Sequence, residues 1–427
     1  MVKVKRFMGF KQIWIGITLI ALLFVTACSG ANGSSGGSGG SESAKGAKSS
    51  EGSSASSGSS SDETVKIGVI LSFTGPFAAL ANDIKSGFEL YLEQNNQQLG
   101  KKKVVAKYED DEGNPQVALR KYRQLVTGDK VDLIIAPVLS NVAYALRDEV
   151  VKDKKIMIVP NAAANDISWG QKSDYIYRVS LSNWQGGYSG GKYIAEHIGK
   201  KAITVANDYS AGKENVAGFK TAFEAAGGKV VKEIYAKIGT NDYGPFITEI
   251  AKEKPDVVYA FLAGNDGASF IKQSSDFGLK GKIPLTGSAE WGDSQIISAT
   301  GDASEGLISA VFYTPWLDNE LNKKFVDAYQ KKYKGLPSMF SVAGFDSGKV
   351  LDQAIAKAGS VKSDDLKEAL KGISWDSPRG PMSLDPKTNN VIQKFYMVKN
   401  TKKNNQVIPE MITEVGQVIM PESAPAK

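Results

Sequence analysis

The chain of 427 residues contains 42% hydrophobic and 23% charged residues, which is typical of a soluble globular protein with room for two domains. Its net charge is +6, but residues 1–27 hold four basic residues and no acid, so the remainder is nearly neutral. This balance argues against nucleic-acid binding, which needs a concentrated basic surface. One cysteine and one histidine disfavour a disulfide framework, a zinc site and a non-haem iron site, and we expect no cofactor or metal.

The N-terminus has the organisation of a secretory signal. Residues 1–11 carry the basic side chains, and residues 13–25 are an apolar run. The run leads into the letters VTAC, which resemble the bacterial lipobox, where the cysteine is acylated and becomes the mature N-terminus. The alternative is a transmembrane anchor, but the run is short for a span. We predict a lipoprotein signal peptide over residues 1–27, a lipid on Cys28, and anchoring on the extracytoplasmic face of the cell membrane.

The segment that follows Cys28 is almost entirely Ser, Gly and Ala up to residue 63. Such a composition cannot bury a core, so we predict that residues 28–63 are the lipidated cysteine and a disordered Gly/Ser linker. A lipid at one end and a flexible linker after it imply a soluble domain that works just outside a membrane.

The stretch after the linker has the pattern of a βαβ unit. The apolar run from Val65 to Leu71 predicts a buried strand, and residues 72–76 are a polar loop. Residues 103–108 predict a second strand, and apolar side chains recur between the two strands at helical spacing, at Ile84, Phe88, Tyr91 and Leu92. The two strands should be parallel, and small ligands bind such sheets at the carboxyl ends of the strands.

The rest of the chain repeats this alternation. Strands are predicted at residues 131–136, 156–159, 175–179, 202–206, 230–235, 256–262, 283–285 and 307–313. Helices are predicted at residues 140–152, 184–198, 243–253, 264–277, 319–333, 337–357 and 364–370, and around residues 216–223. Ser140 and Asn141 are positioned to cap the first of these helices. The order of elements predicts an α/β fold with two doubly wound, Rossmann-like lobes around one ligand cleft.

The end of the chain departs from this alternation. Residues 376–384 and 393–398, joined by a turn at residues 385–390, predict a β-hairpin. Enzyme signatures are missing from the sequence: there is no Gly-x-Ser-x-Gly elbow, no P-loop and no dinucleotide fingerprint. His197 is the only histidine, so a Ser-His-Asp triad would depend on it. We predict that the protein is not an enzyme.

Residues 64–420 resemble the type I periplasmic solute-binding proteins of the Leu/Ile/Val-binding group, which are the receptors of branched-chain amino acid-type ABC importers. No single motif is specific, but their order and spacing together are. The motifs are residues 66–69 with 72–76, 108–111 with 114–115, 159–163, 207–212, 280–284 and 377–381.

The resemblance implies the periplasmic binding protein-like I fold, with two lobes joined by a three-strand hinge that close over a ligand. The implied boundaries are residues 64–182 plus 314–375 for lobe one, residues 183–313 plus 376–420 for lobe two, and residues 421–427 as a tail.

The resemblance also implies where a ligand binds. In the family, carboxylates are held by loops that match residues 138–140 and residues 161–163, where free amides and a hydroxyl favour an anion. The candidates here are Ser140, Asn161, Ala162 and Ala163. Ser140 is either a ligand hydroxyl or a helix cap, and Asn161 either faces the cleft or only ends a strand. The ligand's ammonium group is held by an acid in the loop that matches residues 287–292, where the candidate is Glu290.

Some positions depart from the amino-acid binders. Ala163 stands where a Thr or Ser is usual, and Ala211 replaces a tyrosine, with Tyr209 two residues earlier. A subset of the family, similar to receptors for aromatic acids, shares the motifs at residues 159–162, 183–185, 208–212 and 377–380. Trp184 and Tyr209 therefore either stack on an aromatic ligand or pack at the lobe interface.

The sequence thus predicts a receptor that binds a small carboxylate, of amino acid or aromatic acid type, and delivers it to ABC permease subunits. We expect a monomer that contacts the membrane through its lipid alone and binds no nucleic acid. The alternatives are a ligand-sensing module that serves a signalling partner and, with less support, a secreted α/β hydrolase.

Overall fold

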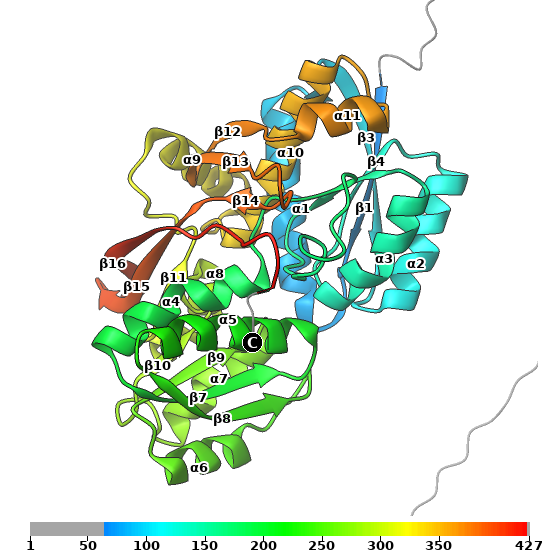
Figure 1. The fold of residues 1–427 in the computed structure, drawn as a ribbon. Helices are drawn as coiled ribbons and strands as arrows, with labels where there is room; N and C mark the ends of the chain where they lie inside the picture. The colour runs from blue at the N-terminus through cyan, green and yellow to red at the C-terminus, as the bar shows by residue number, and fades with distance from the viewer. Residues whose placement is uncertain (1–63, 425–427) are drawn as a thin grey trace, which may run out of the picture. The chain divides into compact units, whose positions relative to one another are not determined.

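The computed structural model describes residues 64–424 (Figure 1). The predicted signal peptide, the lipidation site at Cys28 and the linker up to residue 63 lie outside the described residues. Within residues 64–424, no helix combines the length and the apolar character needed to cross a bilayer.

The first sheet is the product of the predicted βαβ pattern. Its strand order is β2-β3-β1-β4-β5-β6, and all neighbours pair in parallel except β2, which is antiparallel to β3. The strands are β1 (Thr64–Leu71), β2 (Gln98–Leu99), β3 (Lys102–Asp110), β4 (Leu133–Ile135), β5 (Ile156–Val159) and β6 (Ile176–Arg178). Every residue of β4, β5 and β6 is buried, as expected for parallel strands with both faces covered.

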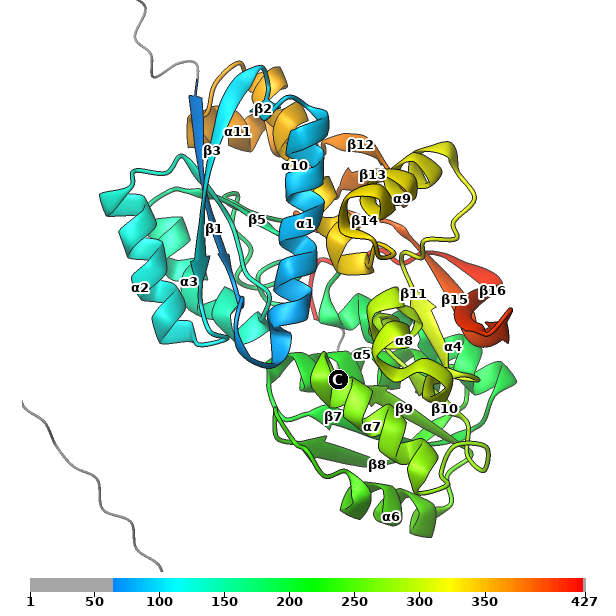
Figure 2. The same ribbon diagram turned by 180° about the vertical axis from the view of Figure 1, so that it is seen from behind.

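Helices cover both faces of this sheet. They are α1 (Ala78–Gln94), α2 (Pro115–Arg123), α3 (Ser140–Lys152), α10 (Met339–Ala358) and α11 (Ser363–Leu370). Helices α2 and α3 lie on one face, whereas α1, α10 and α11 lie on the other (Figures 1 and 2). We call this sheet with its helices the first lobe. Helix α2 was not predicted, although Asn114 caps it by accepting bonds from two backbone amides and Pro115 stands at its start.

The second sheet repeats the plan with two added strands. Its order is β16-β15-β11-β10-β9-β7-β8, with β7 to β11 parallel and β15 and β16 antiparallel. The strands are β7 (Lys201–Asn207), β8 (Lys229–Ala236), β9 (Val257–Phe261), β10 (Leu285–Gly287), β11 (Ile308–Val311), β15 (Lys394–Lys403) and β16 (Gln406–Gln417). The helices are α4 (Asn183–His197), α5 (Ser210–Ala225), α6 (Gly244–Glu253), α7 (Asn265–Asp276) and α8 (Ser294–Thr300). We call this unit the second lobe, and the two sheets confirm the predicted fold class.

The glycines of α4 have a packing role. A side-chain carbon built on Gly187 would lie 1.9 Å from the carbonyl oxygen of Asn215, and one on Gly191 would lie 2.7 Å from the Cβ of Ala222. Both neighbours belong to α5, so the small residues let the two helix backbones approach closely. This contact accounts for a helix whose glycine content is unfavourable in isolation.

The predicted C-terminal hairpin is partly wrong. A small sheet contains β12 (Ser374–Ser377), β13 (Gly380–Leu384) and β14 (Val391–Ile392), and β13 does pair antiparallel with β14 around the predicted turn. After β14 the chain leaves this sheet. The next strand, β15, pairs with β11 and β16 in the second lobe. A strand pattern indicates extended backbone but does not choose the partner strand. Helix α9 (Glu320–Tyr333) packs beside the small sheet.

The chain passes between the lobes at residues 179–182, at residues 312–319 and at Gln393. One buried arginine contacts all of these segments. The Arg379 side chain donates to the carbonyl of Val179 at 2.7 Å and to the Oε1 of Gln393 at 2.6 Å, and its guanidinium lies 5.2 Å from the ring centre of Phe312.

Arg379 is itself held by a buried carboxylate. Its Nη2 lies 2.6 Å from the Oδ2 of Asp346, and both side chains are almost fully buried. Trp375 and Ser377 also donate hydrogen bonds to Asp346. We call Asp346, Trp375, Ser377, Arg379 and Gln393 the hinge cluster, after the prediction that the connecting segments act as a hinge. The boundaries proposed for the two lobes stay predictions.

Candidate functional site

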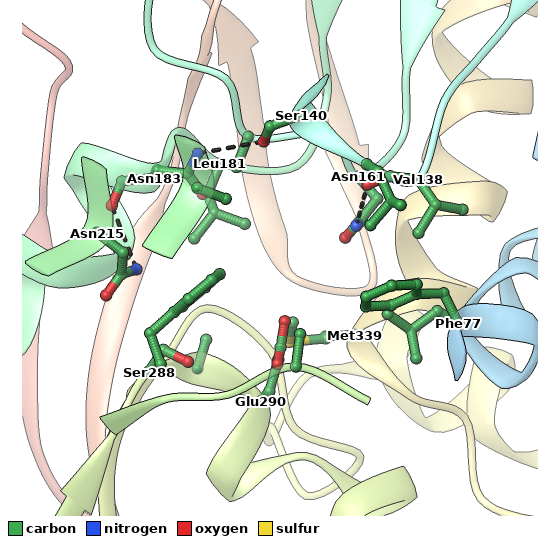
Figure 3. A pocket seen from close by; sticks show the side chains of 18 of the residues that line it. Phe77, Val138, Ser140, Asn161, Leu181, Asn183, Asn215, Ser288, Glu290 and Met339 are labelled. Atoms are coloured by element: carbon green, nitrogen blue, oxygen red, sulfur yellow. Dashed lines mark hydrogen bonds between the residues drawn. The ribbon is translucent and has the colours of Figure 1, made fainter. Parts of the chain in front are cut away.

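A cavity lies between the carboxyl ends of the strands of both sheets (Figure 3). It contains about 530 Å³ of space free of atoms, part of it open to solvent. Of the residues predicted to bind a ligand, the cavity is lined by Ser140, Asn161, Ala163, Tyr209 and Glu290. Ala162 and Trp184 are not among the lining residues.

One end of the cavity is the N-terminus of α3. Ser140 is the first residue of this helix and does not cap it, because the N-cap position is Leu139 and no side chain caps the helix there. The predicted cap is therefore wrong. The Oγ of Ser140 accepts a hydrogen bond from the Nδ2 of Asn183 at 3.2 Å, so its own hydrogen is free to donate to a ligand. The first amides of α3 lack acceptors within the helix and favour an anion at this end.

The loop after β5 adds to this end. The Nδ2 of Asn161 donates to the carbonyl of Val138 at 2.8 Å, which fixes its side chain between the two loops. The amide of Ala162 donates to the carbonyl of Pro137, so it is not free for a ligand, and Ala162 is buried away from the cavity. Ala163 lines the cavity, and its amide nitrogen has no hydrogen-bond acceptor among the described residues. We call Ser140, Asn161 and Ala163 the anion end of the cavity.

The walls between the two ends are largely apolar. They include Phe77, Leu80, Leu181, Phe261 and Met339. The rings of Tyr209 and Phe261 are stacked, with centres 6.5 Å apart. Trp184 instead stacks on Tyr188, outside the cavity lining. The walls can therefore hold a flat apolar group between aromatic side chains.

The opposite end carries Ser288 and Glu290, which follow β10 in the second lobe. Figure 3 shows Glu290 across the cavity from Ser140 and Asn161. Both side chains are buried, and the Oγ of Ser288 and the Oε2 of Glu290 have no hydrogen-bond partner within residues 64–424. Burial raises the pKa of Glu290 to about 8, and the nearby carboxylate of Asp293 adds to the rise. Burial therefore favours the protonated form of Glu290, which can donate a hydrogen bond.

Sequence reasoning missed some of the lining residues. Asn183 and Asn215 line the cavity and are joined by a 3.3 Å bond from the Nδ2 of Asn215 to the carbonyl of Asn183. Ser288 was missed although it stands directly after a buried strand, which is the position where ligand contacts gather in such sheets. Phe77, which is 4% exposed and packs in the hydrophobic core, also forms part of the cavity wall.

Comparisons with known proteins agree with this geometry. The periplasmic binding protein family model matches residues 64–405. The Leu/Ile/Val-binding protein homolog 6 of Brucella melitensis biotype 1 is 31% identical over 351 residues, which cover 80% of this chain and 89% of that protein.

Two solved structures are similar over most of their length. A solute-binding protein of an ABC transporter from R. palustris, in complex with benzoate, has a TM-score of 0.80 at 33% identity and covers 85% of this chain and 99% of its own. Another from Rhodopseudomonas palustris BisB5, in complex with 3,4-dihydroxy benzoic acid, has a TM-score of 0.81 at 30% identity, covering 84% and 99%. The chain belongs to the periplasmic binding protein family and is a solute-binding protein, which confirms the resemblance seen in its motifs.

Proposed function

We propose that this protein is the receptor of an ABC importer and that it binds a small aromatic carboxylate in the cavity between its lobes. The observation that carries the proposal is the contrast between the two ends of the cavity. The anion end offers a hydroxyl and free amides, whereas the opposite end offers a neutral carboxyl group, with aromatic walls between them.

The protonated state of Glu290 favours an aromatic acid over an amino acid. An ammonium group needs an ionised carboxylate, and ionising Glu290 in its buried site is unfavourable. A neutral carboxyl can instead donate to a ring hydroxyl, or lie beside an unsubstituted ring edge. The solute-binding proteins of known structure with benzoate and 3,4-dihydroxy benzoic acid support this ligand class.

An aliphatic amino acid is the second candidate. It is favoured by the relatives named for Leu, Ile and Val binding, and by the presence of an acid at position 290. An amino acid would bind if its ammonium group lowered the pKa of Glu290 enough to ionise the carboxyl group. The two candidates therefore differ in what they require of one side chain.

The remaining parts of the proposal concern the setting of the receptor. We infer that it works on the extracytoplasmic face, held by a lipid on Cys28, as a monomer that presents its ligand to permease subunits. Binding proceeds by closure of the lobes about the connecting segments, without catalysis. The support is the family membership, the lipobox-like motif and the position of the cavity between the two sheets.

Calorimetric titration with benzoate, 4-hydroxybenzoate and L-leucine tests the ligand class. We expect micromolar or tighter binding of an aromatic acid, about 8 kcal/mol or more, and at least 100-fold weaker binding of leucine. Glu290→Gln keeps a donor at the same place, so it should change affinity for 4-hydroxybenzoate by less than about fivefold. Glu224→Gln, at an exposed position of α5, is the matched control. Tight leucine binding that Glu290→Gln abolishes would instead establish the amino acid receptor.

A further inference from the structure

The carboxylate of Glu214 is one of those that join the two lobes, and it lies beside the residues of the anion end. Glu214 belongs to α5 of the second lobe, and its side chain reaches the first lobe. Its Oε1 accepts a hydrogen bond from the hydroxyl of Tyr144 in α3 at 2.6 Å. Its Oε2 accepts from the amide of Asn165, in the loop after β5, at 2.8 Å. These bonds can form only when the lobes are close together, so they belong to a closed arrangement.

The same carboxylate is connected to the anion end. The Nδ2 of Asn183 donates to the Oε2 of Glu214 at 2.8 Å and to the Oγ of Ser140 at 3.2 Å. Asn183 is the first residue of α4, directly after a connecting segment, and it is 2% exposed. One buried amide group therefore links the interlobe contact to the hydroxyl that faces the ligand.

A buried cation of the first lobe acts on Glu214. Arg178 of the first lobe is fully buried, and its guanidinium donates to Asn390, to Ser168 and to the carbonyl of Ala164. Among residues 64–424, its side chain makes no direct ion pair, and Glu214 is the carboxylate whose charge acts on it. Burial raises the pKa of Glu214, whereas the hydrogen bonds that it accepts from Asn183, Tyr144 and Asn165 and the charge of Arg178 lower it, so these contacts favour the carboxylate against burial.

We propose that Glu214 is a clasp that stabilises the closed lobes and that Asn183, as a positioning residue, couples this clasp to the ligand hydroxyl of Ser140. Closure orders Asn183 between the two oxygens, which leaves the hydrogen of Ser140 directed at the ligand. A ligand bound at the anion end in turn keeps the hydrogen bonds among Ser140, Asn183 and Glu214 in place. The inference rests on the proposed closure of the lobes, but it does not depend on which carboxylate binds.

The test measures the separation of the lobes by electron spin resonance. The full chain carries Cys28→Ala, and spin labels are attached at Gln116→Cys on α2 and Ala217→Cys on α5, both exposed positions. Without added solute, Glu214→Ala should lengthen and broaden the distance distribution relative to the parent. Glu224→Ala, on the same helix and exposed, should leave the distribution unchanged.

A second set of variants separates a clasp from a general loss of structure. Tyr144→Phe removes one donor without changing shape, so we expect a smaller shift in the same direction. Combined with Glu214→Ala it should add nothing further, because both changes remove the same bond. Glu214→Ala should also weaken benzoate binding roughly tenfold, mainly through faster dissociation, whereas Glu214→Asp should not restore it because its chain is too short.

The outcomes distinguish this inference from the proposed function. Distances that do not change with Glu214→Ala overturn the clasp, whatever ligand binds. If the parent protein does not bind benzoate, but the distance between the lobes increases when Glu214 is replaced, the result supports the clasp and contradicts the aromatic ligand class. Additive effects of Glu214→Ala and Tyr144→Phe on the distance would overturn the pairing of these two side chains.

Discussion

The hinge cluster and the far end of the cavity are both buried and polar, but they differ in how their groups are paired. In the hinge cluster, Asp346 accepts hydrogen bonds from Arg379, Trp375 and Ser377. At the far end of the cavity, Ser288 and Glu290 have buried oxygen atoms without partners.

The polar groups of the hinge cluster form hydrogen bonds with one another. The polar groups at the far end of the cavity have unused hydrogen-bonding capacity, which a ligand in the proposed site could satisfy. A buried polar atom without a partner costs about 1–3 kcal/mol. Such atoms also occur away from the cavity, for example the hydroxyls of Thr204 and Tyr243, but those of Ser288 and Glu290 belong to residues that line the cavity, where a bound molecule can reach them. A buried ion pair such as Arg379 and Asp346 is completed by the chain itself, and it fixes the segments that connect the lobes. Disrupting the hinge cluster should therefore change stability, whereas disrupting the cavity should change affinity.

The largest expected effect comes from breaking the hinge ion pair. Arg379→Met leaves the Asp346 carboxylate buried without its cation and should lower the free energy of unfolding by about 3–5 kcal/mol. The measurement is chemical denaturation. The exposed pair of Lys402 and Asp302 is the control, where Lys402→Met should leave the free energy of unfolding nearly unchanged. Equal effects at the two pairs would remove the distinction between them.

The second effect is a pH dependence that originates in the cavity. Glu290 holds its proton in the folded protein up to about pH 8, whereas an unperturbed glutamate loses it near pH 4.5. Between these values the unfolded chain binds fewer protons, so the free energy of unfolding should fall as pH rises, by up to about 1.4 kcal/mol per pH unit.

Urea denaturation at pH 5 and at pH 7.5 measures this slope. Glu290→Gln should make the slope shallower without abolishing it, because burial also raises the pKa of Asp293, to about 7. Identical slopes for the parent and for Glu290→Gln would show that Glu290 is ionised in the folded protein.

The smallest effects on stability are expected from a matched pair of serine substitutions. Ser377→Ala removes a 2.9 Å hydrogen bond to Asp346 and should cost about 1–2 kcal/mol of stability, with affinity for the ligand unchanged. Ser288→Ala removes a buried hydroxyl that has no partner among the described residues, so stability should stay the same or rise, by at most about 1–3 kcal/mol. Ligand affinity should fall if Ser288 contacts the ligand, and calorimetry with thermal unfolding reads both quantities. The reverse pattern would contradict the comparison.

Much of the fold could be predicted from local patterns. The strand at residues 156–159 has the predicted bounds, and the helix predicted at residues 140–152 is α3. Long periodic segments are predictable because burial of one face selects the period. Other elements were missed: β16 has few buried residues, so its sequence carries only a weak alternating pattern.

The candidate site was predicted less completely than the fold. Five of the suggested residues line the cavity, but Ser140 is not a helix cap, and the amide of Ala162 is already paired. Asn183 could not be assigned a role from its neighbours, because its two acceptors lie 43 and 31 positions away in the chain. Such contacts depend on the arrangement of distant loops in space, which no local sequence pattern predicts.

The sequence by itself determined the alternation of strands and helices and the two-lobed class, because periodicity and turn residues are local properties, and its resemblance to a known family indicated the loops expected to carry the ligand contacts. Only the tertiary structure decided which strands pair after Gln393, which serine is left without a partner and which glutamate is buried far enough to keep its proton. Those properties depend on the solvent and the charges that surround each atom, and these are supplied by residues distant in the chain.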